Sequence, residues 1–180
     1  RFAHASSFKL SLAAMVLAFG ERGIIHPGEV LHWTEADMMW VSPVTRANFA
    51  TGLSMREPAR ATLVTSDDTA ANVLLQRLGG PEALTAFWRS TGDQISRLDR
   101  YEPDLNVVPP GTTLDSMTPM AMGNTVARLV TGKVLSAENT ARLREWMAQV
   151  RTGMDRIRAA FPDDWIAGDK IGTALAMMCT

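Results

Sequence analysis

The sequence predicts an α+β fold in which helices dominate. Capped amphipathic segments recur along most of the chain, one segment near its end has the pattern of a strand, and hydrophobic residues make up 46% of the sequence, as in a soluble protein with a real core. A lone strand is not stable, because three or more strands with a hydrophobic face are normally needed. We find no repeat or linker that would divide the chain, and therefore expect one domain over residues 1–180 whose partner strands are missing.

An apolar run predicts the first helix over residues 7–19, closed by Gly20 or Gly23. Because the run is apolar on every side, we expect it at the centre of the fold with other helices around it. It superficially imitates a signal peptide, since Arg1 and Lys9 precede it. It is too short to span a bilayer, which needs about 20 residues, and no small-x-small cleavage site follows. A buried core helix is the better interpretation.

Caps and hydrophobic periodicity predict five further helices and one strand. The expected helices cover residues 54–63, 69–78, 81–90, 119–129 and 137–150. Prolines and a glycine prevent regular structure between residues 100 and 117, and the apolar anchors Leu105, Val107 and Val108 favour an ordered, functional loop. The short, partly β-branched segment 165–172 predicts the strand.

The charge and the cysteine and histidine content of the sequence indicate no particular binding partner, metal or cofactor. Eighteen basic and nineteen acidic residues give a net charge of −1 without a long block of either sign, so nothing indicates nucleic acid or an anionic membrane. The single cysteine, Cys179, excludes an intrachain disulfide and leaves the redox compartment open. His4, His26 and His32 are scattered, and Cys179 has no partner at metal-ligand spacing. We therefore expect no metal and no cofactor.

Ser6 and Lys9 form the first of four clusters that could carry chemistry. They place a hydroxyl and an amine on one face at the start of the buried helix, where backbone N–H groups would stabilise an oxyanion. A serine becomes a good nucleophile only when a base takes its proton, and lysine is such a base only if burial lowers its pKa. Ser-x-x-Lys alone occurs about once by chance in a chain of this size, so an N-cap serine and a solvent-reaching lysine explain it as well.

The other three clusters also have ordinary structural explanations. Capping of the following helix explains the polar run Ser-Asp-Asp-Thr-Ala-Ala-Asn over residues 66–72. In the long loop, Glu102 and Asn106 could together hold a water molecule, as hydrolysis of an acyl-enzyme requires, or they could belong to a solvated loop. Lys170 lies beside Gly172, where a ligand could approach the backbone closely, but an edge-strand lysine fits equally.

Together and in this order, the four clusters resemble the class A β-lactamase family, whose marks are S-x-x-K, S-D-N, E-x-x-x-N and K-[ST]-G. The intervals between Ser6, Ser66, Glu102 and Lys170 match without insertion or deletion. The resemblance implies an all-helical lobe beside a five-stranded antiparallel sheet. It also implies that residues 1–180 form a single catalytic domain truncated at both ends, as a fragment or an incompletely recorded form of a larger enzyme.

The resemblance implies a role for each catalytic candidate. Ser6 would attack the lactam carbonyl and Lys9 would shuttle its proton, although the family's acylation base is disputed between this lysine and Glu102. Ser66 would relay a proton to the lactam nitrogen. Lys170 would orient that serine and attract the substrate carboxylate. Glu102 would hold the water that releases the acyl group.

The resemblance also implies substrate-binding residues and two structural ion pairs. The implied substrate-binding residues are Val41, Asp68, Asn106, Arg156, Gly172 and Thr173. The backbone N–H of Thr173 would complete an oxyanion hole with that of the nucleophile. Arg100 and Asp115 would close the neck of the active-site loop, and Arg158 would pair with Asp169.

Two positions depart from the family pattern. Asp68 stands where the family has an asparagine whose amide donates to the acylamido carbonyl of the substrate, and a carboxylate cannot donate unless it is protonated. Ile171 replaces a Thr or Ser whose hydroxyl helps to bind the substrate carboxylate, with Thr173 as a partial substitute. We expect these changes to lower efficiency rather than to alter the type of reaction.

Several alternatives stay open at this point. A penicillin-binding D,D-peptidase shares the serine and lysine but lacks a deacylating glutamate in such a loop, and related glutaminases and esterases lack E-x-x-x-N at this interval. A lactam sensor that is acylated but not turned over is a third alternative. We expect a monomer that acts on a small-molecule β-lactam in the periplasm or as a secreted protein, with no nucleic-acid or membrane partner. The substrate spectrum depends on the placement of Val41, Asn106, Thr173 and Ala174, and identities alone do not give it.

Overall fold

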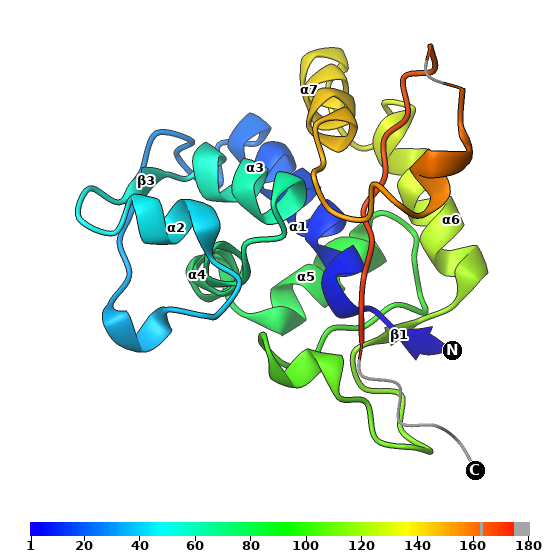
Figure 1. Cartoon of the computed structure of the whole chain (residues 1–180), viewed down its shortest axis with the longest axis horizontal. Helices are drawn as coiled ribbons and strands as arrows, with labels where there is room; N and C mark the ends of the chain where they lie inside the picture. The colour runs from blue at the N-terminus through cyan, green and yellow to red at the C-terminus, as the bar shows by residue number, and fades with distance from the viewer. Residues whose placement is uncertain (163, 175–180) are drawn as a thin grey trace.

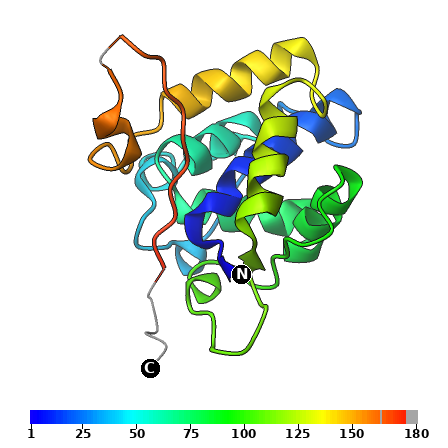
Figure 2. The same cartoon turned by 90° about the vertical axis from the view of Figure 1, so that its right-hand side faces the viewer.

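Helix α1 (Phe8–Glu21) occupies the centre of the fold in a computed structural model that describes residues 1–162 and 164–174 (Figures 1 and 2). Every residue from Phe8 to Ala18 is buried, because helices α3, α4, α5, α6 and α7 all contact this helix. The apolar sequence on all sides of α1 therefore has the central position that the sequence predicted. The single cysteine of the sequence, Cys179, lies outside the described residues.

Short helices and two-residue strands complete the architecture. In chain order, the elements besides α1 are β1 (Phe2–Ala3), η1 (Ala5–Ser7), β2 (Val30–Leu31), η2 (Glu35–Asp37), α2 (Pro43–Ala47), β3 (Leu53–Ser54), α3 (Arg56–Val64), α4 (Asp68–Leu78), α5 (Pro81–Ser90), η3 (Asp104–Asn106), β4 (Ser116–Met117), α6 (Pro119–Val130), α7 (Ala137–Ala148) and η4 (Ile157–Ala160). The strands pair antiparallel as β1 with β4 and β2 with β3. The β1–β4 pair joins the segment before α1 to the end of the long loop.

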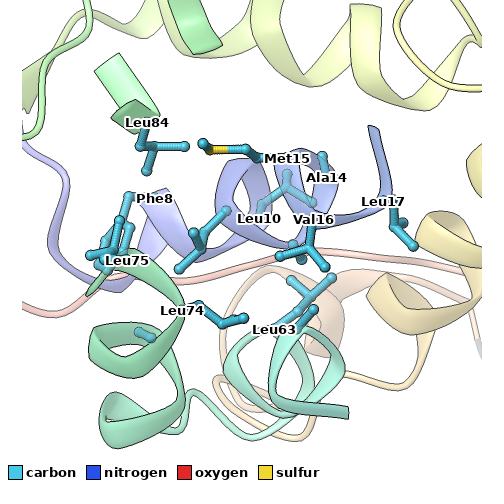
Figure 3. Packing of buried hydrophobic residues seen from close by; sticks show 14 of the residues in the cluster. Phe8, Leu10, Ala14, Met15, Val16, Leu17, Leu63, Leu74, Leu75 and Leu84 are labelled. Atoms are coloured by element: carbon cyan, nitrogen blue, oxygen red, sulfur yellow. The ribbon is translucent and has the colours of Figure 1, made fainter. Parts of the chain in front are cut away.

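Aliphatic side chains from three helices pack around α1 (Figure 3). Leu63 of α3, Leu74 of α4 and Leu84 of α5 are fully buried in the same hydrophobic cluster as Phe8 and Met15 of α1. Burial of each such side chain stabilises the fold by about 1.5–3 kcal/mol relative to exposure. The turn before α1 is thereby attached to the most deeply buried part of the molecule.

The structure confirms the predicted helices to within a few residues at their ends. Helix α5 has the predicted bounds, and α4 ends where Gly79 adopts a left-handed φ of 98°. At the start of α3, Glu57 Oε2 accepts hydrogen bonds of 2.8 Å from both the backbone N–H and the hydroxyl of Ser54, although Met55 and not Ser54 is the N-cap. Helix α2 was not predicted, because its five residues are too few for a periodic pattern.

The strand predicted over residues 165–172 is not present among the described residues. The segment runs past α1 as an extended but irregular chain (Figure 1). A strand requires ladder hydrogen bonds to a neighbour, and no described residue pairs with this segment. Its local sequence favours extended backbone, but local sequence cannot supply the missing partner.

Candidate active site

A cavity of about 260 Å³ contains most of the predicted site residues. Its lining comes from the turn before α1, the segment before α2, the start of α4, the long loop, the segment after α7 and the last described residues. The lining residues are Ser6, Val41, Ser66, Asp68, Glu102, Asn106, Thr152, Ile171 and Thr173. Thr152 is a lining residue that no sequence motif indicated, and its buried hydroxyl has no hydrogen-bond partner within the described chain.

The turn η1 presents Ser6 at the N-terminal end of the central helix. Ala5, directly before Ser6, has a left-handed φ of 42°, which is uncommon for a residue other than glycine and costs about 1–3 kcal/mol. The neighbouring Ser7 stabilises the turn, because its hydroxyl donates a hydrogen bond of 2.6 Å to the carbonyl of His4. The Ser6 hydroxyl itself has no hydrogen bond to any described residue, and it lines the cavity.

The side-chain nitrogen of Lys9 is fully buried and lies between the other polar clusters of the site. Its Nζ donates to the carbonyl of Ser66 at 3.0 Å and to its hydroxyl at 3.3 Å. The same Nζ lies 3.1 Å from Oε1 of Glu102 and contacts Oδ1 of Asp68. The sequence placed Lys9 near Ser6, but in the structure the hydrogen bonds of this lysine are to the start of α4 and its ion pairs are with Asp68 and Glu102.

The hydroxyl of Ser66 lies between two lysine side chains. Lys170 Nζ donates to Ser66 Oγ at 3.1 Å and to the carbonyl of Ile171 at 2.9 Å. Burial, together with the smaller effect of the charge of Lys9, lowers the pKa of Lys170 to about 7 against the opposing effect of nearby carboxylates. The backbone of Ser66 is left-handed with φ of 59°. A hydroxyl held between two amines is able to pass a proton from one to the other.

Asn72 and Asn106 hold Glu102 from two sides. The side chain of Asn72 donates to the carbonyl of Glu102 and accepts from its N–H, both at 2.9 Å. Asn106 Nδ2 donates to Glu102 Oε2 at 2.5 Å. Only the pairing of Glu102 with Asn106 was predicted. The role of Asn72 was missed because residues so far apart in the sequence form no recognisable spacing.

Asp67 and Asp68 have different functions at the start of α4. Asp67 is the N-cap of the helix and accepts from Ala70 N at 2.9 Å, which confirms the capping explanation for this residue. It also accepts from the backbone N–H and the hydroxyl of Thr45 at 2.9 Å each, so it fastens α2 to α4. Asp68 instead faces the cavity. Burial and the nearby Glu102 raise the pKa of Asp68 against the opposing effect of Lys9.

The last described residues lie against the turn that carries Ser6. A Cβ added to Gly172 would lie 2.7 Å from the carbonyl of His4 and 3.2 Å from the N–H of Ser6, so only glycine permits this close approach. Arg156 Nη2 lies 3.2 Å from the Thr173 hydroxyl and donates to it. The structure thus brings Thr173 and Val41 to the cavity itself and places Gly172 and Arg156 next to it.

Both predicted ion pairs are present. Arg100 Nε lies 2.6 Å from Oδ2 of Asp115, whose side chain is fully buried at the neck of the long loop. Arg158 Nη2 lies 2.8 Å from Oδ1 of Asp169. The residues that the structure describes contain no group of three His, Cys, Asp or Glu side chains placed to hold a metal ion, and no helix long and apolar enough to cross a membrane.

His4, two residues before Ser6, was missed as a site-supporting residue because a single histidine has no motif. Its ring is stacked on Trp88 with centroids 4.7 Å apart and planes 6° apart. Neither ring nitrogen has a hydrogen-bond partner within the described part of the chain. Burial lowers the pKa of His4 to about 4, although Asp93 and Asp99 oppose this effect. The ring is therefore buried in its neutral form.

The neutral state of His4 predicts a loss of stability in mild acid. The unfolded chain binds a proton near the ordinary pKa of 6.5, whereas the folded protein binds it only near 4, so protonation favours unfolding between these values. We expect the free energy of unfolding to fall by about 2 kcal/mol more in the wild type than in His4→Phe between about pH 7.5 and pH 5. Urea denaturation of both proteins at both pH values measures this. Parallel pH profiles would contradict the assignment.

Comparison with known proteins agrees with this geometry. The sequence model of the beta-lactamase enzyme family matches residues 1–178, and the chain belongs to that family. It is 45% identical to a beta-lactamase of Streptomyces fradiae, over 96% of this chain and 58% of that relative, and 42% identical to the beta-lactamase AST-1 of Nocardia asteroides, over 96% and 56%. The chain thus spans a little over half the length of these curated relatives.

Solved structures place the chain in class A of the family. An ancestral class A β-lactamase matches with a TM-score of 0.93 and 43% identity, over 96% of this chain and 66% of that one. A β-lactamase from Burkholderia vietnamiensis matches with a TM-score of 0.92 and 46% identity, over 96% and 64%. These folds are α+β, so the expected fold class is confirmed.

Proposed function

We propose that the protein hydrolyses the β-lactam amide bond through an acyl-enzyme on Ser6. One observation carries the proposal: Ser6, Ser66 and the Glu102–Asn106 pair line a single cavity, and the buried Lys9 contacts both Ser66 and Glu102. This arrangement places a nucleophile, a buried lysine and a carboxylate able to hold water around one cavity. Membership of the beta-lactamase enzyme family supports the same reaction.

In acylation, the Ser6 oxygen attacks the lactam carbonyl and its proton leaves through Lys9 or Glu102. The C–N bond of the ring then breaks, and Ser66 passes a proton to the lactam nitrogen while Lys170 donates to the hydroxyl of Ser66. Backbone N–H groups of Ser6 and Thr173 stabilise the oxyanion. The close packing of Gly172 against the Ser6 turn supports this pairing of N–H groups.

In deacylation, Glu102 takes a proton from a water molecule that then attacks the acyl carbon. Asn106 donates to the glutamate and limits the directions from which water can approach it. Attack releases the product acid and returns the proton to Ser6. A penicillin-binding D,D-peptidase has no equivalent of this pair, so the pair favours hydrolysis over that alternative.

Substrate binding uses residues on the side of Ser66 where Lys170 lies, away from Glu102. Lys170 and Thr173 attract the substrate carboxylate, and Arg156 supports Thr173 from behind. Val41 and Asn106 contribute to the wall around the acyl side chain. We infer that the protein acts as a monomer on small β-lactams, in the periplasm or after secretion, because the target of these antibiotics lies outside the cytoplasm.

Mass spectrometry after mixing with benzylpenicillin tests the proposal, with turnover of a chromogenic cephalosporin measured in parallel. Ring opening expels no atoms, so we expect a transient adduct with the whole mass of the penicillin, followed by its release. Ser6→Ala should give no adduct, whereas Ser7→Ala, which changes the neighbouring hydroxyl, should still give one. A permanent adduct in the wild type would favour a sensor or a peptidase, and no adduct at all would refute acylation.

A further inference from the structure

The two ends of the cavity carry opposite charge. At one end Asp68 and Glu102 line the wall with Lys9 buried between them, and ordinary charges on these three side chains sum to −1. At the other end, two cations lie just outside the lining: Lys170 donates a hydrogen bond to Ser66, and Arg156 donates one to Thr173. A bound molecule therefore meets a field that favours an anionic group at one end and a cationic group at the other.

Two contacts position Asp68 at the acidic end. Its backbone N–H donates to the carbonyl of Val41 at 2.8 Å, and its Oδ1 contacts Lys9. Its side chain remains 18% exposed, and Oδ2 accepts no hydrogen bond from any residue in the described ranges. An ionised carboxylate oxygen accepts hydrogen bonds and cannot donate them. The free oxygen therefore attracts a donor or a cation and repels another acceptor.

A penicillin-type β-lactam fits this field in one orientation. Its ring carboxylate is attracted to Lys170 and Arg156, so its acyl side chain extends toward the acidic end. We propose that Asp68 is a specificity-determining residue, which makes the protein prefer β-lactams whose acyl side chain carries an ammonium group. This inference rests on the proposed hydrolysis, because the lactam must first be a substrate.

Three penicillins that differ at one carbon provide a matched test. Benzylpenicillin, ampicillin and carbenicillin carry hydrogen, an amino group and a carboxylate, respectively, at the α carbon of the same phenylacetyl side chain. At about pH 6.5 the amino group is mostly protonated. For the full-length protein we expect kcat/KM to decrease in the order ampicillin, benzylpenicillin, carbenicillin. The reverse order would overturn the proposal.

Asp68→Asn removes the charge while it keeps the shape of the side chain. We expect the ratio of kcat/KM for ampicillin to that for benzylpenicillin to fall about tenfold. The ratio of kcat/KM for carbenicillin to that for benzylpenicillin should rise by a similar factor. Glu138→Gln is the matched control, because its exposed carboxylate lies on α7 and not at the cavity. This control should leave both ratios unchanged.

The outcomes separate the two proposals. If none of the penicillins is hydrolysed or bound covalently, the proposed function fails. If they are hydrolysed but the ratios are the same with Asp68 and with asparagine, only the specificity inference fails. If the variant does not fold, kcat/KM for the three penicillins is measured in the wild type at low and high salt concentration. Screening of the charge of Asp68 by salt should bring the three values together. An order that is insensitive to salt would then overturn the role of Asp68.

Discussion

Glu102→Ala is expected to trap the acyl-enzyme that the wild type releases. The substitution removes the carboxylate that activates the deacylating water, and loss of a positioned general base typically lowers the rate of such a step by about 10²–10⁴. Acylation of Ser6 should stay detectable, so the penicillin adduct should accumulate in a mass spectrum while steady-state turnover falls. Stopped-flow mixing with a chromogenic cephalosporin should show a burst of product equal to the enzyme concentration.

Two further variants make this result specific. Glu102→Gln keeps a side chain of the same size beside Asn106 but supplies no base, so it should also trap the adduct. Asp104 lies next to the same loop turn with an exposed side chain, and Asp104→Ala should turn over normally. Unchanged turnover in Glu102→Ala would refute the role assigned to this glutamate.

The ion pair at the neck of the long loop predicts the largest loss of stability. The fully buried carboxylate of Asp115 accepts from the N–H of Asp99 at 2.7 Å, from the N–H of Arg100 at 3.0 Å and from Arg100 Nε at 2.6 Å. Asp115→Ala leaves these donors without their partner. Breaking a buried pair in this way costs about 3–5 kcal/mol, and we expect at least about 3 kcal/mol here, because Arg100 is partly exposed.

Chemical denaturation followed by circular dichroism measures this loss. The control is Glu138→Ala, which removes an exposed partner of Arg142 one helical turn away and should cost only about 0.3–0.5 kcal/mol. A loss of similar size in both variants would contradict the structural importance of the loop neck.

Local sequence predicted the helices well because their signals are local. Helix α5 begins at Pro81, which suits the first turn, and Gly92 follows its C-cap Thr91, while the apolar run of α1 could only be buried. The predicted strand over residues 165–172 failed because a strand depends on hydrogen bonds to a distant neighbour. Helix α2 was missed because its five residues are too few for a periodic pattern, and its hydrogen bonds to Asp67 join it to a distant cluster.

The site was predictable only as a combination of motifs. The sequence indicated Ser66, Glu102 and Asn106, and the structure brings them to one cavity with Ser6. The sequence contained no indication that Lys9 would contact Asp68, because that contact joins residues on two different helices. The stacking of His4 on Trp88 is equally distant in sequence. Contacts of this kind follow from tertiary packing and have no local signature.

The burial of α1 has a consequence for the motions of the catalytic groups. Amide protons in a helix that lies wholly inside the core exchange with solvent only when the whole molecule unfolds, whereas a long loop opens by local fluctuations. We expect the amides that follow Ser6 in α1 to be among the slowest to exchange, and those of the loop around Glu102 to be much faster. The nucleophile and the water-activating carboxylate would then belong to cooperative units of different stability, so mild destabilisation should impair deacylation before it impairs acylation.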